Sequence, residues 1–130
     1  MGFCRCLGHN YDVKTIATYV VVEENNDQWQ AEEKAWEKVE KLYKNKHDDI
    51  AEYEPATDKI EYAGNGKYHV WIDVTHKIKT IAHNDDKAIE SAEDIVRKID
   101  YPNCMARLYI DSEIESVESE PALDIILEDE

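Results

Sequence analysis

Hydrophobic and polar residues alternate most regularly between Lys59 and Ile78, on both sides of the short sequence Gly64-Asn65-Gly66. Glycine and asparagine tolerate the positive φ angles of a tight hairpin turn. Successive side chains of a strand point to opposite faces, so the second run presents two different faces. One face holds Tyr68, Val70, Ile72 and Val74, and the other holds His69, Trp71, Asp73 and Thr75. The pattern predicts a β-hairpin whose second strand is central in the fold.

Two further stretches predict strands. Val13 to Glu24 is rich in β-branched and aromatic residues, and Cys104 to Val117 returns to alternation. In both strands we expect apolar even-numbered positions to face the core. These positions are Ile16, Thr18, Val20 and Val22 in the first strand, and Ala106, Leu108, Ile110 and Ile114 in the second. Beyond Pro121, the segment Ala122 to Leu127 predicts a short terminal strand or a helical turn.

Apolar residues recur at helical spacing in two stretches between the strands. The first helix should start after a cap at Asn25–Asp27 and extend to about Lys46, and the second should start at Asn84 or Asp85. Between the first helix and the hairpin, His47 to Thr57 predicts a polar connection. The apolar stripes are Ala35, Trp36, Val39, Leu42 and Tyr43, then Ala88, Ile89, Ala92, Ile95, Val96 and Ile99.

The order strand, helix, strand, strand, helix, strand predicts an α+β fold. A ferredoxin-like split βαβ (βαββαβ) sandwich satisfies this order, with a four-stranded antiparallel sheet, two helices on one face and an acidic C-terminal extension. At 130 residues the chain is long enough for one domain with a real core. We expect an N-terminal lead over residues 1–12, a single α+β domain over 13–117 and an acidic tail over 118–130.

Composition narrows the class of protein. Hydrophobic residues make up 42% of the chain, which excludes a disordered polymer. The longest apolar run, Tyr19 to Val22, is far shorter than the roughly 20 residues of a membrane span. The N-terminus has no hydrophobic block typical of a signal peptide, and three cysteines do not indicate a disulfide framework. We therefore expect a soluble, intracellular protein of the cytoplasm.

The net charge of −15 is the strongest departure from an average protein. Nine acids and no lysine or arginine occur in residues 111–130, so this segment supplies nine of the fifteen excess negative charges. Like charges repel, so we expect neither direct nucleic-acid binding nor binding to anionic membranes.

Two helices on one face of a sheet leave the other face uncovered. Aromatic residues on its first and third strands resemble the base-stacking residues of an RNA-recognition motif. The chain has no Lys/Arg-Gly-Phe-like run, however, and carboxylates share the same face, which argues against RNA binding. A second copy of the chain or the C-terminal segment is the alternative cover for these aromatics. The residues expected on the uncovered face are Tyr19, Glu61, His69, Trp71, Asp73, Arg107, Tyr109, Asp111, Glu113 and Glu115.

Candidate chemistry is sparse. Cys4, Cys6 and His9 offer two thiolates and an imidazole, to which Cys104 or another histidine would add a fourth zinc ligand. Their C-x-C-x-x-H spacing differs from the C-x₂₋₄-C pairs of structural zinc sites, so we expect no metal and no cofactor.

His47-Asp48-Asp49 offers cation ligands but is typical of a solvated helix end. His69 and His76 are seven residues apart and should lie on opposite faces of one strand. No nucleophile, base or phosphate-loop motif is present, and we expect no enzyme activity.

Two classes of function remain. The first is an acidic binding protein that mimics nucleic-acid charge and blocks a nucleic-acid-binding enzyme. In size and acidity the chain is similar to small phage-encoded inhibitors of restriction or CRISPR nucleases, which implies an anti-CRISPR or anti-restriction role in a host cytoplasm. The second is a ferredoxin-like oligomeric module, either a small-ligand binder or an enzyme with its site between subunits. Acidity that serves only solubility is the alternative to both. The predicted partner-binding residues are Tyr19, Glu23, Glu61, Trp71, Asp73, Tyr109, Asp111, Glu113, Glu115, Glu118 and Glu120.

Overall fold

The computed structural model describes the backbone of residues 6–44 and 50–127 and the side chains of residues 8–44 and 50–118. Six elements follow one another in the predicted order. They are β1 (Cys6–Glu24), α1 (Gln28–Lys44), β2 (Ile50–Gly64), β3 (Lys67–Ala82), α2 (Asp85–Arg97) and β4 (Met105–Leu127). The predicted α+β class, with a four-stranded antiparallel sheet and two helices, is confirmed.

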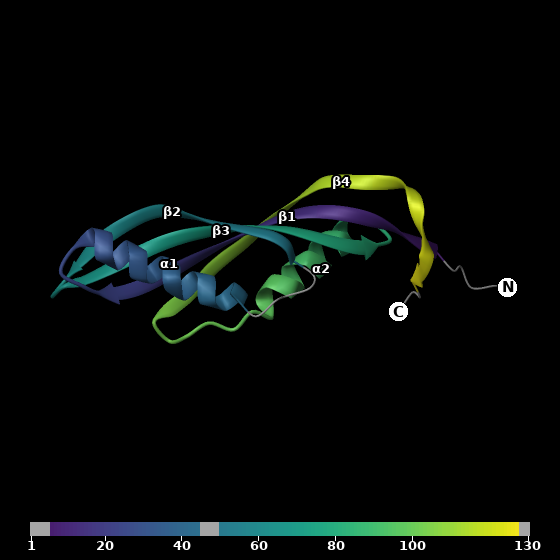
Figure 1. Cartoon of the computed structure of the whole chain (residues 1–130). Helices are drawn as coiled ribbons and strands as arrows, with labels where there is room; N and C mark the ends of the chain where they lie inside the picture. The colour runs from purple at the N-terminus through teal and green to yellow at the C-terminus, as the bar shows by residue number, and fades with distance from the viewer. Residues whose placement is uncertain (1–5, 45–49, 128–130) are drawn as a thin grey trace.

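The sheet has the strand order β2-β3-β1-β4, and each neighbouring pair is antiparallel. Strand β1 pairs with β3 from His9, opposite Ala82, to Glu24, opposite Lys67. On its other side it pairs with β4 from Cys6, opposite Leu127. Both helices lie against the same face of this long, twisted sheet (Figure 1), and no helix in the described part of the chain covers the opposite face. None of the helices in the described part of the chain is long and apolar enough to cross a membrane.

Local signals in the sequence explain where the elements begin and end. Gly64, Asn65 and Gly66 have φ angles of 88°, 54° and 74°, the positive values that the hairpin turn between β2 and β3 requires. Asn84 caps α2 by accepting a hydrogen bond from the Lys87 amide at 2.9 Å. At the first helix, the Asp27 carboxylate accepts from the Gln30 amide at 2.8 Å. The caps predicted from the sequence are therefore present.

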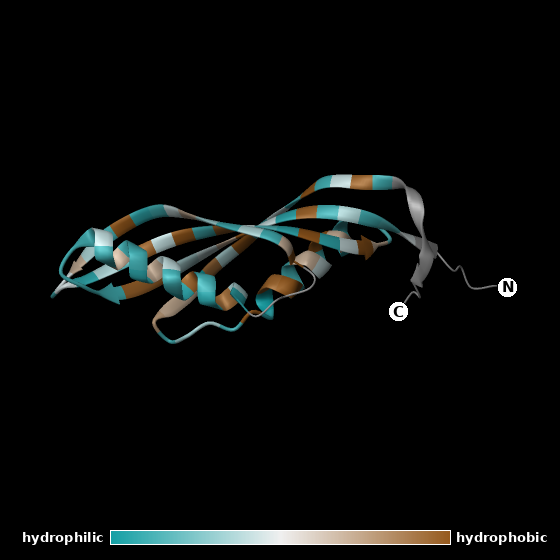
Figure 2. Cartoon of the chain, in the orientation of Figure 1, coloured by the Kyte–Doolittle hydropathy of each residue, from teal (hydrophilic) through white to brown (hydrophobic). Residues whose placement is uncertain are grey.

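The core lies between the helices and the covered face of the sheet. The predicted faces of β3 are confirmed, because Val70, Ile72 and Val74 are buried beneath the helices. Figure 2 shows apolar and polar residues alternating along the strands. In β1, however, the predicted phase is wrong. The positions buried beneath the helices are odd-numbered: Tyr11, Val13, Thr15, Ala17, Tyr19, Val21 and Glu23. Among the even-numbered positions Thr18 is also buried, and its hydroxyl binds Asp73.

Strand β4 also departs from its predicted pattern. Ile110 and Ile114 pack against the core as predicted, but Leu108 is 49% exposed and Ala106 is also exposed. The reason is a β-bulge. Tyr109 pairs with Thr18 and Arg107 with Tyr19, so Leu108 is an extra residue with no partner on β1. The bulge changes which residues face the helices, which a strict period of two does not anticipate.

The strands are longer than the sequence pattern predicts. Ile50 to Thr57 belongs to β2 rather than to a connection, because Ile50 pairs with Ile78 on β3. The segment Ala122 to Leu127 belongs to β4, so of the two predicted alternatives the strand is correct. Its backbone pairs with the first residues of β1. Division of the chain at residues 12 and 117 stays a prediction.

Candidate functional site

The uncovered sheet face, called the open face below, carries the alternate side chains of all four strands. The strand register places these side chains at successive levels across β2, β3, β1 and β4. The four central levels are Lys59, Trp71, Val20 and Ala106; Ala56, Asp73, Thr18 and Tyr109; Glu54, Thr75, Ile16 and Asp111; and Glu52, Lys77, Lys14 and Glu113.

One end of the open face is apolar. Val20 and Trp71 lie side by side on the two central strands and are only partly buried. Tyr109, on the edge strand β4, is 62% exposed. The Lys59 ammonium lies 4.3 Å from the centroid of the Trp71 ring, close enough for a cation–π interaction. This arrangement leaves a partly exposed aromatic and aliphatic patch where no helix covers the sheet.

The other end of the open face is charged, with lysines in the centre and acids at the edges. Lys77 on β3 lies 3.6 Å from Glu52 on β2, and Lys14 on β1 lies 3.7 Å from Glu113 on β4. All four side chains are at least one third exposed, so these ion pairs contribute little stability. Their arrangement matters more, because it places positive charge on the central strands and negative charge on the two edges.

The structure brings six predicted partner-binding residues together on the open face. Three of them are partly compensated: Asp73 accepts a hydrogen bond from the Thr18 hydroxyl at 2.7 Å, Glu61 lies 3.4 Å from Lys59, and Glu113 lies 3.7 Å from Lys14. Asp111 makes no ion pair with any residue that the structure describes. The six residues are Glu61, Trp71, Asp73, Tyr109, Asp111 and Glu113.

Three further acids follow on β4. Glu115 is exposed and has no partner on β1, because Ile114 pairs with Val13 and the next pair joins Ser116 to Asp12. Glu118 is exposed, and its carboxylate accepts a hydrogen bond from the Asn10 amide at 3.0 Å. The side chain of Glu120 lies outside the described residues. Acidic side chains thus continue along the edge strand beyond the charged end of the open face.

Tyr19 and Glu23 are not on the open face, and this part of the prediction is wrong. Tyr19 is fully buried beneath the helices, and Glu23, 5% exposed, forms an ion pair with Lys38 of α1. Both follow from the odd-numbered phase of β1. Arg107 also lies on the helix side, where its guanidinium donates hydrogen bonds to three carbonyls at the end of α2. These carbonyls belong to Val96, Arg97 and Ile99, each at 3.0 Å.

A buried polar network between α1 and the sheet was not predicted. Nδ1 of His76 donates to the carbonyl oxygen of Thr15 at 2.8 Å, because a carbonyl only accepts. His76 Nε2 is then the acceptor for the Tyr43 hydroxyl at 2.5 Å, and the Tyr19 hydroxyl lies 3.2 Å from that of Tyr43. Burial, and then the neighbouring Tyr19, raise the pKa of Tyr43 above its ordinary value. The network is enclosed in the core, so its role is structural. His69 lies on the opposite face, as predicted.

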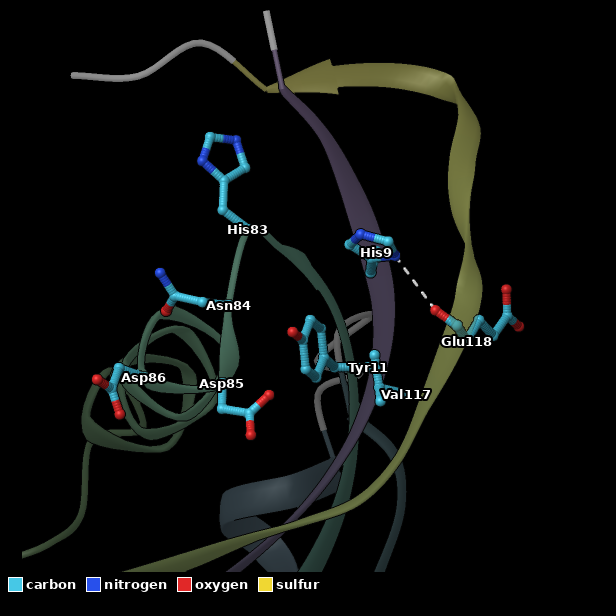
Figure 3. Close-up of a pocket in the computed structure, with 8 residues that line it drawn as sticks. All are labelled: His9, Tyr11, His83, Asn84, Asp85, Asp86, Val117 and Glu118. Atoms are coloured by element: carbon cyan, nitrogen blue, oxygen red, sulfur yellow. Dashed lines mark hydrogen bonds between the residues drawn. The ribbon is translucent and has the colours of Figure 1, made fainter. Parts of the chain in front are cut away.

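A pocket of about 520 Å³ opens where α2 begins, beside the first part of β1 and the middle of β4 (Figure 3). His9 donates from Nδ1 to the backbone oxygen of Glu118 at 3.2 Å. Burial and a hydrogen bond to the Asp85 carboxylate raise the pKa of Tyr11. In Figure 3 the ring of His83 points away from the carboxylates of Asp85 and Asp86. The lining residues are His9, Tyr11, His83, Asn84, Asp85, Asp86, Val117 and Glu118.

No three His, Cys, Asp or Glu side chains within the described ranges are placed to hold a metal ion. Of the predicted zinc candidates, Cys4 and the side chain of Cys6 lie outside the described residues, as does the cation candidate His47-Asp48-Asp49. Cys104 is a free cysteine. The expectation of no metal and no cofactor stays a prediction.

Comparison with known proteins adds no further assignment. No family model, curated protein or solved structure matches this chain.

Proposed function

We propose that this protein is a non-enzymatic binding protein whose acidic edge strand competes with nucleic acid for a basic groove on a partner enzyme. The observation that carries the proposal is the row of exposed carboxylates on β4. Asp111 and Glu113 project from the same face of the strand, and the exposed Glu115 and Glu118 follow them. Because β4 is at the edge of the sheet, a partner approaches this row without displacing another element.

The spacing of the carboxylates determines how closely such a surface matches the charge density of DNA. Side chains two residues apart on a strand are separated by about 6.6–6.8 Å. One strand of duplex DNA carries a phosphate every roughly 3.4 Å along the axis. A single row of carboxylates therefore has about half the linear charge density of one DNA strand. Binding through such a row is electrostatic, and we expect it to weaken as salt shortens the screening length to about 8 Å at physiological ionic strength.

The size and acidity of the chain favour one class of partner, a nuclease of the restriction or CRISPR type. The protein would then be a phage-type inhibitor, anti-restriction or anti-CRISPR, that acts in the host cytoplasm. Inhibition on this proposal is steric and electrostatic, so the protein needs no catalytic group, metal or cofactor. The partner is a protein, and the protein itself contacts neither nucleic acid nor membrane.

The test is competitive capture. The immobilised protein is exposed to bacterial lysate, and bound enzymes are eluted with a short DNA duplex or, in parallel, with an uncharged polymer. We expect the duplex to release a nuclease or another nucleic-acid-binding enzyme at low salt. A variant with Asp111→Lys, Glu113→Lys and Glu115→Lys should lose the capture and keep its melting temperature. A captured enzyme that the duplex does not displace, or that the triple variant still binds, overturns the proposal.

A matched control separates the acidic row from net charge. Glu33 and Glu40 are exposed on α1, and Asp100 is exposed after α2. Reversing these three residues to lysine changes the net charge by the same amount as the β4 triple variant. We expect this control to retain capture. Equal loss in both variants would mean that overall charge, and not the β4 row, determines binding.

We also infer that the fold is of the ferredoxin-like split βαβ type and ends in an acidic extension over residues 118–130. Support comes from the connections. Helix α1 joins β1 to β2 across β3, and α2 joins β3 to β4 across β1, so each helix links two strands that are not neighbours. A crystal structure of the protein tests both the handedness of these connections and the extension.

A small-ligand-binding module is the second candidate, favoured by the pocket beside α2. Tyr11 and Val117 provide apolar walls, and carboxylates and imidazoles surround them. Such a lining suits a small organic amine. NMR titration with putrescine tests it, since binding should shift the ring signals of His9 and His83, and unchanged signals at millimolar amine would exclude this ligand class.

A further inference from the structure

We propose that two copies of this chain pack through their open faces, about a two-fold axis that runs across the strands at the level of Thr18 and Ile16. The chain as a whole carries a net charge of −15, so most of its surfaces repel a second copy. The open face differs because lysines alternate with acids there and apolar side chains fill one end. A second copy that packs there therefore meets attractive as well as repulsive charges.

The size of the face suits a dimer. Strands lie about 4.8 Å apart, and levels are separated by about 6.6–6.8 Å. Four strands and the six levels from Glu61 to Asp12 cover a projected area of about 600 Å², before the relief of the side chains is added. Stable interfaces bury roughly 800 Å² per partner. The face also has the composition of an interface centre, because Trp71 and Tyr109 are exposed in part beside Val20 and Val22.

Charge complementarity selects the axis. Lys59 and Glu52 lie on β2 at equal distances on either side of the Thr18–Ile16 level. A two-fold axis across the strands places each strand opposite the same strand of the partner subunit, running in the reverse direction. Lys59 then faces Glu52 of the partner subunit, and the pair occurs twice. On β3 the same operation sets Trp71 against Lys77 of the partner subunit, a cation–π arrangement.

The other symmetric arrangement, with the axis along the strands, is unfavourable. It would keep each level opposite itself and exchange β1 with β3 and β2 with β4. Lys77 would then face Lys14 of the partner subunit, and Glu52 would face Glu113 of the partner subunit. Both contacts bring like charges together, which weakens an interface. Only the axis across the strands pairs unlike charges.

The dimer has a consequence for the acidic row, and this step rests on the proposed function. The axis across the strands places the β4 strands of the two copies against each other. Asp111 faces Tyr109 of the partner subunit, and Glu113 faces Ala106 of the partner subunit, so the acids of the two rows do not collide. The two rows then continue each other end to end, with a carboxylate every roughly 6.6–6.8 Å, so the dimer doubles the length of the acidic row while its charge density stays at about half that of one DNA strand.

Sedimentation equilibrium tests the dimer without any partner enzyme. We expect the parent to be dimeric in the micromolar range at physiological ionic strength. Lys59→Glu alone and Glu52→Lys alone should each weaken the dimer at least about tenfold, because each sets like charges against each other twice. The double variant should recover to within about threefold of the parent, since it restores the pair with reversed signs.

Control variants keep charge and folding separate from the contact. Lys34→Glu and Glu33→Lys on α1 make the same charge changes away from the open face and should leave the dimer unchanged. Circular dichroism and the melting temperature show whether each variant is folded. A parent that is monomeric at millimolar concentration, or a double variant no better than the single ones, overturns the dimer. A monomer that still releases its nuclease to the DNA duplex would leave the proposed function standing while this inference falls.

Discussion

Ile72→Ala tests the assignment of the core most directly. The Ile72 side chain is fully buried at the centre of the sheet, where β3 has β1 on one side and β2 on the other. Truncation removes buried methylene and methyl groups and leaves a cavity, which costs about 2–5 kcal/mol. Flanking strands on both sides limit collapse, so we expect about 3–4 kcal/mol. For 130 residues, an unfolding entropy of about 2.1 cal/mol/K per residue converts this loss to a fall of about 10–15 °C in Tm.

Leu108→Ala is the matched control. Leu108 is about half exposed at the bulge in β4, so the same kind of truncation should cost about 1 kcal/mol or less. Urea unfolding followed by circular dichroism measures both variants, with the slope of the transition as a check on two-state behaviour. Equal losses at the two positions, or a loss below about 1 kcal/mol for Ile72→Ala, would show that the assignment of faces in the sheet is wrong.

Three further predictions concern the contacts beneath the helices. Arg107→Met removes the hydrogen bonds to the end of α2 and should lower the free energy of unfolding, measured by urea unfolding, by about 1.5–3 kcal/mol. An unchanged free energy would mean that water solvates the carbonyls equally well. Burial raises the pKa of Tyr43, so the hydroxyl loses its proton at lower pH in the unfolded chain than in the fold. The free energy of unfolding should therefore fall as pH rises above about 10, and it should fall less in Tyr43→Phe. Burial lowers the pKa of Lys38, but Glu23 outweighs it and the net pKa is raised. The contribution of protonated Lys38 to the stability of the fold is therefore full below about pH 10.4 and is lost as pH rises through the raised pKa. Melting curves of Lys38→Arg should show this loss only at higher pH.

The phase of β1 illustrates what a sequence pattern does not determine. Val20, Val21 and Val22 are consecutive, and both parities of the strand hold apolar residues. A central strand covered on one face by helices and half-shielded on the other has little polar contrast between its faces. The even-numbered phase expected for the core therefore placed Tyr19 on the open face. In the fold its hydroxyl lies beside Tyr43 instead, a contact from a helix that begins after β1 ends.

The hairpin turn and strand β3 were predictable because their signals are local. Gly64 and Gly66 supply the turn, and β3 alternates cleanly because its open face is polar around Trp71. The bulge at Leu108 and the long pairing of β4 with β1 have no local signal, since they depend on register between residues about a hundred positions apart. For the same reason the pocket beside α2 was missed. Its walls come from three segments that are far apart in the sequence, residues 9–11, 83–86 and 117–118.

The acidity of β4 has two physical explanations, and they make different demands on the side chains. An edge strand needs charges to prevent pairing with the edge of another molecule. That purpose is served by acids on either face, at any spacing, and by lysines equally well. Asp111 and Glu113 share one face of β4, and no lysine or arginine occurs from residue 111 to the end of the chain. The proposed recognition of a basic groove requires charges of one sign on the surface that the partner contacts, and protection of an edge does not. The proposal therefore accounts for the absence of bases along β4, which protection of the edge leaves unexplained.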